Sequence, residues 1–229
     1  MLDARAARRY TSVVSVDPRH DSTEPAATGV ATAGDAGGAA AALPLVASDP
    51  RWIEVALADL DAIHRDHLHC ERKAAQSALS LVRSYPDEVA LVGAVARLAH
   101  EETAHVVQVG ALLERRGLRA GYDHGDDYAA ALRALVRKGE PERQLDRLLV
   151  FAVIEGRSAE RLGLLADVLT EPRTRELYAG LASAELRHRD TFLGLAEALA
   201  PTRWRARAAE LAAAEAALLA SRPVRARIH

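Results

Sequence analysis

Glutamate and histidine residues recur in this chain at a spacing that suits metal binding. Glu71 comes 31 residues before Glu102, and His105 follows three residues after Glu102. Positions i and i+3 share one face of an α-helix, so Glu102 and His105 would direct a carboxylate and an imidazole to one point. Helical bundles that bind two metal ions in their core need this set twice, from two halves of the bundle. One set alone is weak evidence, because Glu-x-x-His also arises by chance.

A second copy of the pattern follows the first at a nearly constant distance. Glu155 comes 30 residues before Glu185, and His188 follows three residues later, so the three lie 84, 83 and 83 residues after their counterparts. Glu155 lies in the apolar stretch of residues 148–156, where an unpaired charge would be costly. Two divalent cations neutralise four carboxylates and make their burial tolerable. The repeat therefore predicts a buried site for two metal ions, rather than solvated glutamates and surface histidines.

The predicted donors are carboxylates and imidazoles without a thiolate, a set that favours iron or manganese over zinc. Two metal ions that share carboxylates can act together on one bound oxygen species. We expect each ion to have one terminal glutamate and one terminal histidine, with two glutamates bridging the ions. The assignment is Glu71 and His105 on one ion, Glu155 and His188 on the other, and Glu102 and Glu185 as bridges.

Four further residues are candidates for supporting these ligands. A metal-bound histidine usually donates its second N–H to a carboxylate or a carbonyl. Asp66 and Asp146 are the candidate acceptors, with surface ion pairs as the alternative role. His67 lies one helical turn before Glu71 and is a candidate neighbour of the site. Arg157 would balance the charge of the pocket, meet the substrate, or pair with a nearby acid.

The composition favours an all-α protein. Of the 229 residues 49% are hydrophobic, carried by Ala and Leu, and only 4% are aromatic. The single cysteine, Cys70, excludes a disulfide framework and a four-cysteine metal site. No apolar run reaches the length of a membrane span, and the N-terminus lacks the apolar stretch of a signal peptide. We therefore expect a cytoplasmic protein, and the net charge of -2 does not itself indicate nucleic-acid binding.

The chain divides into three predicted segments. Residues 1–46 are rich in Ala, Gly, Ser and Thr and are expected to be a disordered leader. Residues 47–200 would form the metal-binding domain, with long helices near 50–82, 86–116, 141–169 and 171–200 and a short helix near 128–138. Asp49 and Thr170 are the expected caps of the first and fourth helices. Residues 201–229, with six Arg against two Glu, would form a basic C-terminal helix and tail.

Each long helix carries its ligands near mid-length, so the four ligand positions fall at one level. The predicted fold is a ferritin-like four-helix bundle with one long crossover, an extra short helix and a C-terminal helix.

The segments around the ligands form a recognisable set: DHLHCERKAA at residues 66–75, RLAHEE at 97–102, LDRL at 145–148, IEGRSAER at 154–161 and AELRH at 184–188. This set resembles the signature segments of the MiaE-type tRNA hydroxylases, over roughly residues 52–199. The resemblance implies a ferritin-like, non-haem di-iron monooxygenase. Its substrate would be the isopentenyl group of 2-methylthio-isopentenyl-adenosine, beside the anticodon of tRNA, with O2 as co-substrate. A separate reductase would supply electrons, because the chain has no flavin or iron–sulfur motif.

Two alternatives remain open from the sequence. The first is a ferritin-like di-iron oxidase or peroxidase that acts on iron or a small molecule. The second is a metal-free helical RNA-binding protein. The basic C-terminal residues are expected to be solvated, or to contact phosphates if tRNA binds. Metal content separates the second alternative from the others, and the product formed from tRNA separates the first from the hydroxylase.

Overall fold

A computed structural model describes residues 43–229 of the chain, which contain α-helices and no strand. The predicted all-α class is confirmed. The helices are α2 (Arg51–Ala58), α3 (Leu60–Ser84), α4 (Val89–Arg115), α5 (Asp127–Ala134), α6 (Glu142–Val168), α7 (Pro172–Leu199) and α8 (Trp204–Ala220). None of the helices between residues 43 and 229 combines the length and the apolar character needed to span a bilayer.

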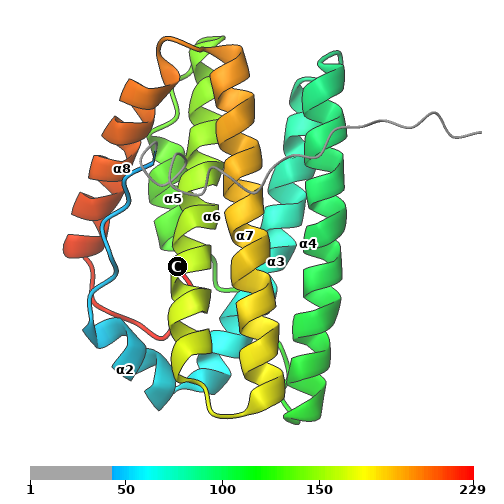
Figure 1. The fold of residues 1–229 in the computed structure, drawn as a ribbon, viewed down its shortest axis with the longest axis vertical. Coiled ribbons are helices and arrows are strands. Elements are labelled where there is room, and N and C mark those ends of the chain that lie inside the picture. Colours follow the sequence, from blue (N-terminus) through cyan, green and yellow to red (C-terminus); the bar gives the residue numbers. More distant parts are fainter. Residues whose placement is uncertain (1–42) are drawn as a thin grey trace, which may run out of the picture. The chain divides into compact units, whose positions relative to one another are not determined.

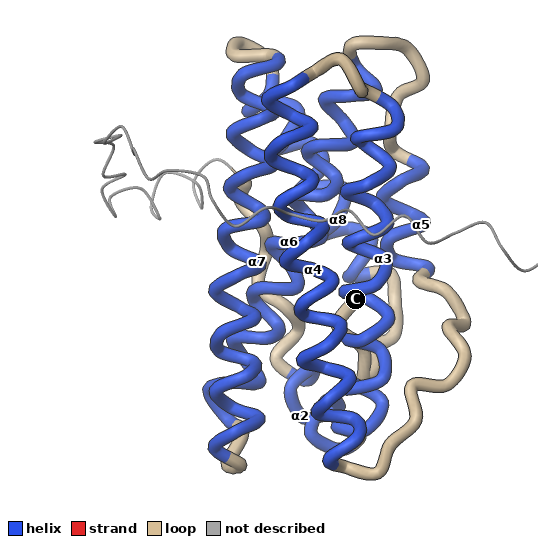
Figure 2. Tube along the Cα trace, turned by 90° about the vertical axis from the view of Figure 1, so that its right-hand side faces the viewer, coloured by secondary structure: helices blue, strands red, loops and turns tan. Residues whose placement is uncertain are grey.

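Four long helices make the bundle, as two pairs of sequence neighbours. Helix α3 packs along α4, and α6 packs along α7, with the two pairs side by side in Figure 1. The shorter α5 and α8 pack on α6, and α8 lies on the side away from α3 and α4 in Figure 1. Figure 2 shows the long loop that leads from α4 back to α5. This loop is the long crossover that the predicted topology requires.

Two apolar clusters fill the bundle, one toward each end. One contains Leu81, Leu98 and Leu148, and the other contains Ile63 and Leu162. Along each long helix the predicted ligands fall between residues of the first cluster and residues of the second. A polar layer therefore crosses the bundle between two dry layers, which keep water from its ends.

Two helix starts differ from the predictions. The first long helix breaks at Asp59, whose carboxylate accepts from the backbone N–H of Ala62 at 3.0 Å and caps α3. Helix α7 is capped by the carboxylate of Glu171, which accepts from the backbone N–H of Thr174 at 2.8 Å, so the predicted cap Thr170 is wrong. In both cases an acidic side chain lies where it can satisfy free N–H groups of the first turn.

Both ends of the described chain pack against the bundle. Residues 1–42 of the expected leader lie outside the described residues, but Leu43 is buried in the core. Leu45 crosses Gly156, where an added Cβ would lie 2.8 Å from Leu45 Cδ1. At the other end Ile228 is fully buried, and its N–H donates to Asp66 Oδ2 at 2.8 Å. The basic C-terminal segment therefore returns to the bundle after α8.

Candidate metal centre

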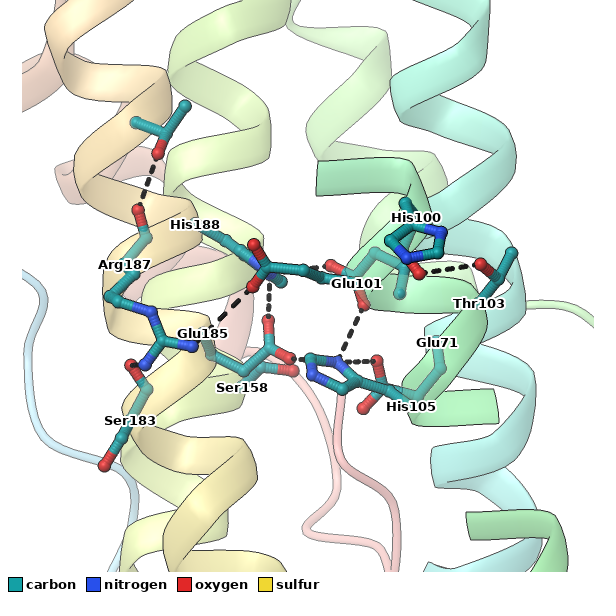
Figure 3. A network of polar contacts seen from close by, with 12 residues as sticks. Glu71, His100, Glu101, Thr103, His105, Ser158, Ser183, Glu185, Arg187 and His188 are labelled. Atoms are coloured by element: carbon teal, nitrogen blue, oxygen red, sulfur yellow. Dashed lines mark hydrogen bonds and ion pairs between the residues drawn. The ribbon is translucent and has the colours of Figure 1, made fainter. Parts of the chain in front are cut away.

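The six predicted ligands meet in the polar layer of the bundle. Helix α3 supplies Glu71, α4 supplies Glu102 and His105, α6 supplies Glu155, and α7 supplies Glu185 and His188. Each of the six is at most 6% exposed. Figure 3 shows the side chains from the two helix pairs pointing toward one another across the bundle axis. Burial of four carboxylates together requires a compensating positive charge.

Their donor atoms form two overlapping groups, each within 4.8 Å. One group is Glu71, Glu102, His105 and Glu185, and the other is Glu102, Glu155, Glu185 and His188. Both groups contain Glu102 and Glu185, the residues that the sequence assigns as bridges. This arrangement suits two ions that share two carboxylates, and the bridging role itself remains a prediction.

Several donor atoms in the pocket approach one another without forming hydrogen bonds. His188 Nδ1 lies 2.8 Å from Glu102 Oε1, yet neither atom has a hydrogen-bond partner within residues 43–229. Glu185 Oε1 is also buried without a hydrogen bond from residues 43–229, and His105 Nδ1 lies 3.6 Å from it. Buried polar atoms are rarely left unpaired, and lone pairs that converge on one point are typical of ligands around a cation. Oxygen and nitrogen donors without sulfur fit iron or manganese.

Burial and mutual repulsion hold protons on two of the carboxyl groups in the absence of metal. Burial, with the charge of Glu185, raises the pKa of Glu102 to about 8. The same two causes raise the pKa of Glu155 well above its usual range. Metal ions would displace these protons, because they supply positive charge to the same atoms.

Histidines have the opposite effect on Glu71. Burial alone would raise the pKa of Glu71, but His67 and His105 hold it below its usual range. His105 Nδ1 lies 3.3 Å from Glu71 Oε2 and 3.3 Å from Glu102 Oε2. Burial opposes charge on His105, yet hydrogen bonds with Glu102 and Glu71 raise its pKa to about 10. The metal-free pocket is therefore a network of shared protons.

Two neighbours of the ligands are in contact with them. His67 Nε2 is bonded to Glu71 Oε1, and the His67 ring stacks on Tyr178 with centroids 5.4 Å apart. Glu101, which the sequence analysis missed, lies 3.2 Å from His188 Nε2 and is drawn beside it in Figure 3. Glu101 therefore occupies the place of the carboxylate that usually orients a ligand histidine. Only the packing of α4 against α7 reveals it, because the two residues are 87 positions apart.

The other candidate supporting residues serve different partners. Asp146 accepts hydrogen bonds from Arg137 Nε at 2.9 Å and Arg207 Nε at 2.9 Å, far from any ligand histidine. Asp66 accepts from the backbone N–H of Ile228. Asp66 and Asp146 thus do not orient the ligand histidines, and the prediction is corrected in favour of Glu101.

Arg157 points away from the pocket into a buried ion pair. Its Nε lies 2.8 Å from Glu215 Oε1, and both side chains are fully buried. It also pairs with Glu160 on the next turn of α6. Arg157 therefore ties α8 to α6, which is the acid-pairing alternative among its three candidate roles.

A small cavity of about 40 Å3 adjoins the ligands and offers an apolar wall beside them. Glu71, Glu155 and Glu185 line it together with Phe151 and Phe192. The rings of Phe151 and Phe192 are in contact, with centroids 5.4 Å apart. A carbon chain placed in this cavity would lie directly beside the metal ligands.

Comparison with known proteins gives a consistent set of relatives. The family described as tRNA-(MS[2]IO[6]A)-hydroxylase (MiaE) matches residues 42–229. The tRNA 2-(methylsulfanyl)-N(6)-isopentenyladenosine(37) hydroxylase of Pseudomonas putida is 42% identical over 179 residues, which cover 78% of this chain and 87% of that protein. The enzyme of the same name from Salmonella typhimurium is 29% identical over 210 residues, which cover 71% of this chain and 77% of that protein.

A solved structure shares the fold as well as the sequence. It is a protein from Synechococcus described as having aldehyde deformylating oxygenase activity, with a TM-score of 0.75 and 37% identity. The match covers 81% of this chain and 94% of that chain. The predicted ferritin-like helical architecture is therefore confirmed by a known oxygenase structure.

Proposed function

The chain belongs to the MiaE family of tRNA hydroxylases, and we propose that it hydroxylates the isopentenyl group of 2-methylthio-isopentenyl-adenosine in tRNA with two iron ions and O2. The observation that carries this proposal is the pair of overlapping donor groups with two shared glutamates. An oxygen-dependent hydroxylating enzyme is what its named relatives and the oxygenase fold indicate. The site of action would be the modified adenosine beside the anticodon.

Bound iron would activate O2, so that one oxygen atom enters the substrate and the other leaves as water. The chain's own side chains would hold the two ions and orient the ligands. Glu102 and Glu185 would bridge the ions, while Glu71, His105, Glu155 and His188 would each bind one ion. Glu101 fixes the orientation of His188, and His67 fixes that of Glu71.

The apolar wall of the small cavity would select the substrate's carbon chain and exclude water. Phe151, Ile154 and Phe192 line the cavity together with Glu155. An aliphatic group gains about 0.8 kcal/mol for each CH2 that it buries, so such a wall favours the isopentenyl group over a polar one. Electrons would come from a separate reductase, and the enzyme would act in the cytoplasm, where tRNA is modified.

A small-molecule oxygenase is the second candidate function. The likeness to the Synechococcus protein with aldehyde deformylating oxygenase activity favours it. A metal-free RNA-binding protein is disfavoured, because it gives no role to four carboxylates and two histidines that are buried together.

Nucleoside analysis of treated tRNA tests the proposal. Iron-loaded protein, a chemical or enzymatic reductant and O2 are incubated with tRNA that carries the methylthio-isopentenyl nucleoside. We expect this nucleoside to gain the mass of one oxygen atom, and the Glu185→Ala variant to give no product. A protein with two irons per chain that leaves the tRNA unchanged, but converts a fatty aldehyde, would establish the second candidate instead.

A further inference from the structure

The small cavity beside the metal ligands, called here the inner cavity, shares Asp126 and His229 with a larger cavity. The larger outer cavity has a volume of about 530 Å3, and its wall includes Trp52, Tyr128, Arg161, Arg222, Arg225 and Arg227. Among the described residues only Asp126 and His229 line both cavities. The side chain of His229 is 5% exposed. His229 therefore forms part of the partition between solvent and the inner cavity.

The imidazole of His229 sits in a slot suited to a flat heteroaromatic ring. It stacks on Tyr128, with centroids 5.3 Å apart and ring planes inclined by 11°. Its Nε2 lies 3.2 Å from Ser158 Oγ, and its Nδ1 lies 3.4 Å from Asp126 Oδ2 and 3.5 Å from Cys70 Sγ. Stacking on one face with polar groups around the ring edge is how proteins hold unpaired nucleobases.

The platform under this ring is fixed independently of His229. The hydroxyl of Tyr128 donates to Glu215 Oε1 at 2.9 Å, and Glu215 is paired with Arg157. Tyr128 is 2% exposed, and the Glu215 and Arg157 side chains are fully buried. Loss of the imidazole would therefore leave the Tyr128 ring in place for another aromatic ring.

The inner cavity is too small for the substrate group while His229 is in place. Its volume is only about 40 Å3. A cavity of about 150 Å3 is known to hold benzene, so a five-carbon isopentenyl group needs more room than the inner cavity provides. Withdrawal of the His229 ring would join this space to the outer cavity.

The wall of the outer cavity has five arginines against three aspartates, and its arginines other than Arg51 form no ion pair within the described residues. Arg222 donates to the carbonyl of Asp127 at 3.0 Å, and Arg227 donates to the carbonyl of Gly125 at 3.1 Å. Arg161 is 7% exposed and lies over the Trp52 ring.

The hydrogen bonds of Arg161 also go to neutral oxygens, those of Ser48 and Ile228. The acids of the same wall are partly taken up, because Asp49 pairs with Arg51 and Asp126 with Lys73. Guanidinium groups bound only to neutral oxygens retain their full attraction for phosphate.

We propose that the outer cavity binds the phosphates that flank the modified adenosine, and that the adenine ring takes the place of the His229 imidazole on Tyr128. The N6 substituent then points from the Tyr128 slot into the inner cavity, toward Glu155 and the other ligands. This inference rests on the proposed function, since it assigns the binding site of that substrate. The His229 imidazole thus occupies the slot beside the metal pocket until a nucleotide displaces it.

Binding of an anticodon stem–loop that carries the methylthio-isopentenyl nucleoside tests the phosphate site. Fluorescence anisotropy at several salt concentrations compares wild type with the double variant Arg222→Ala, Arg227→Ala. We expect the double variant to bind about 10-fold more weakly or worse, with a salt slope smaller by about 1–2. The control is Arg83→Ala, an exposed arginine at the end of α3 that lines neither cavity. Equal affinity and salt slope in the double variant and the control would overturn the phosphate site.

Two substitutions of His229 test the base slot with the free methylthio-isopentenyl nucleoside, which has no phosphate. His229→Ala empties the slot and should bind the nucleoside several-fold more tightly than wild type. His229→Phe keeps a ring on Tyr128 and should bind as wild type does. Circular dichroism verifies that both variants are folded. Nucleoside binding by folded His229→Ala that is no tighter than that of His229→Phe would contradict the slot.

The outcomes that would refute the binding site differ from those that would refute the proposed function. Wild type that contains iron but leaves tRNA unmodified would refute the hydroxylase. Wild type that hydroxylates tRNA, with arginine and His229 variants that bind like their controls, would refute only the binding site.

Discussion

The two helix pairs supply the same ligands but hold their first glutamate differently. Four residues before Glu71 stands His67, and four residues before Glu155, at the equivalent position 84 residues on, stands Phe151. His67 is bonded to the Glu71 carboxylate, whereas Phe151 lines the inner cavity and contacts Phe192.

The difference appears in the acidity of the two glutamates. Burial opposes ionisation at both, but His67 and His105 hold the pKa of Glu71 low, and the charge of Glu185 adds to burial in raising that of Glu155. One half of the bundle thus fixes its ligand with a hydrogen bond. The other half places an apolar wall there, which the substrate chain can contact. The symmetric ligand set therefore has asymmetric surroundings, with a hydrogen bond beside Glu71 and an apolar wall beside Glu155.

The largest expected effect comes from a residue that both halves share. Glu185→Ala should lower bound iron from about two ions per chain to below one, because both donor groups lose a member. Hydroxylation should fall below detection. Elemental analysis after anaerobic Fe(II) loading measures the change, with Glu176→Ala, an exposed glutamate of the same helix, as control. Retention of two ions by Glu185→Ala would refute its bridging role.

Exchange of His67 and Phe151, the residues that distinguish the two halves, should affect metal binding and substrate binding separately. His67→Phe removes the hydrogen bond to Glu71 and should weaken iron binding about 10–100-fold, as the loss of such partners does elsewhere. Phe151→His should instead raise KM for tRNA, because it replaces part of the apolar wall. Chelator competition and steady-state kinetics measure the two effects. Equal changes in metal affinity for both variants would contradict the proposed asymmetry.

Neutral isosteres of the two glutamates should shift metal-free stability in opposite directions. Glu71→Gln loses charge-assisted bonds with His67 and His105 and should cost about 1–3 kcal/mol in the free energy of unfolding. Glu155→Gln removes a group that must be protonated to remain buried, and should stabilise the metal-free protein by a similar or smaller amount. Urea unfolding at pH 7 with a chelator present measures both shifts. Destabilisation by both variants would contradict the opposite roles of the two glutamates.

The pH dependence of the metal-free protein should be opposite to that of an ordinary salt-bridged carboxylate. The folded pKa of Glu102, about 8, lies above the ordinary value of 4.5, so the folded state binds more protons between these pH values. Stability should therefore fall as pH rises from about 5 to 8, by no more than about 1.4 kcal/mol per pH unit for this group.

The two ligand histidines should extend this fall in stability to higher pH. His105 and His188 have folded pKa values of about 10, so the stability that they contribute is complete below pH 6.5 and is lost as pH rises toward 10. Glu102→Gln should flatten the decline between pH 5 and 8. Thermal unfolding across this pH range, with and without metal, measures it, and a stability that rises with pH in the chelated protein would contradict the shared-proton network.

The sequence predicts the ligand layer well because helical spacing and the repeat carry the same information. A ligand on each of four long helices needs only the i, i+3 relation and the 83–84 residue offset. The composition and the apolar pattern predict that the helices exist. The break at Asp59 and the use of Glu171 in place of Thr170 depend on which nearby polar side chain satisfies the free N–H groups of the first turn.

Long-range packing accounts for what the sequence does not predict. Glu101 reaches His188 only because α4 and α7 lie opposite each other, and Asp66 binds the backbone of Ile228, 162 residues away. No local pattern indicates that His229 returns to Tyr128. The contrast between His67 and Phe151, however, is visible in the sequence once the two halves are aligned on their glutamates.

The central claim is that six buried side chains hold two metal ions bridged by Glu102 and Glu185. Mössbauer spectroscopy of the protein loaded anaerobically with 57Fe(II) and then oxidised tests it directly. We predict two ferric ions per chain that are magnetically coupled, so that the spectrum at low temperature and low field shows quadrupole doublets without magnetic splitting. A single ferric ion per chain, or two uncoupled ions with magnetically split spectra, would contradict the bridged site.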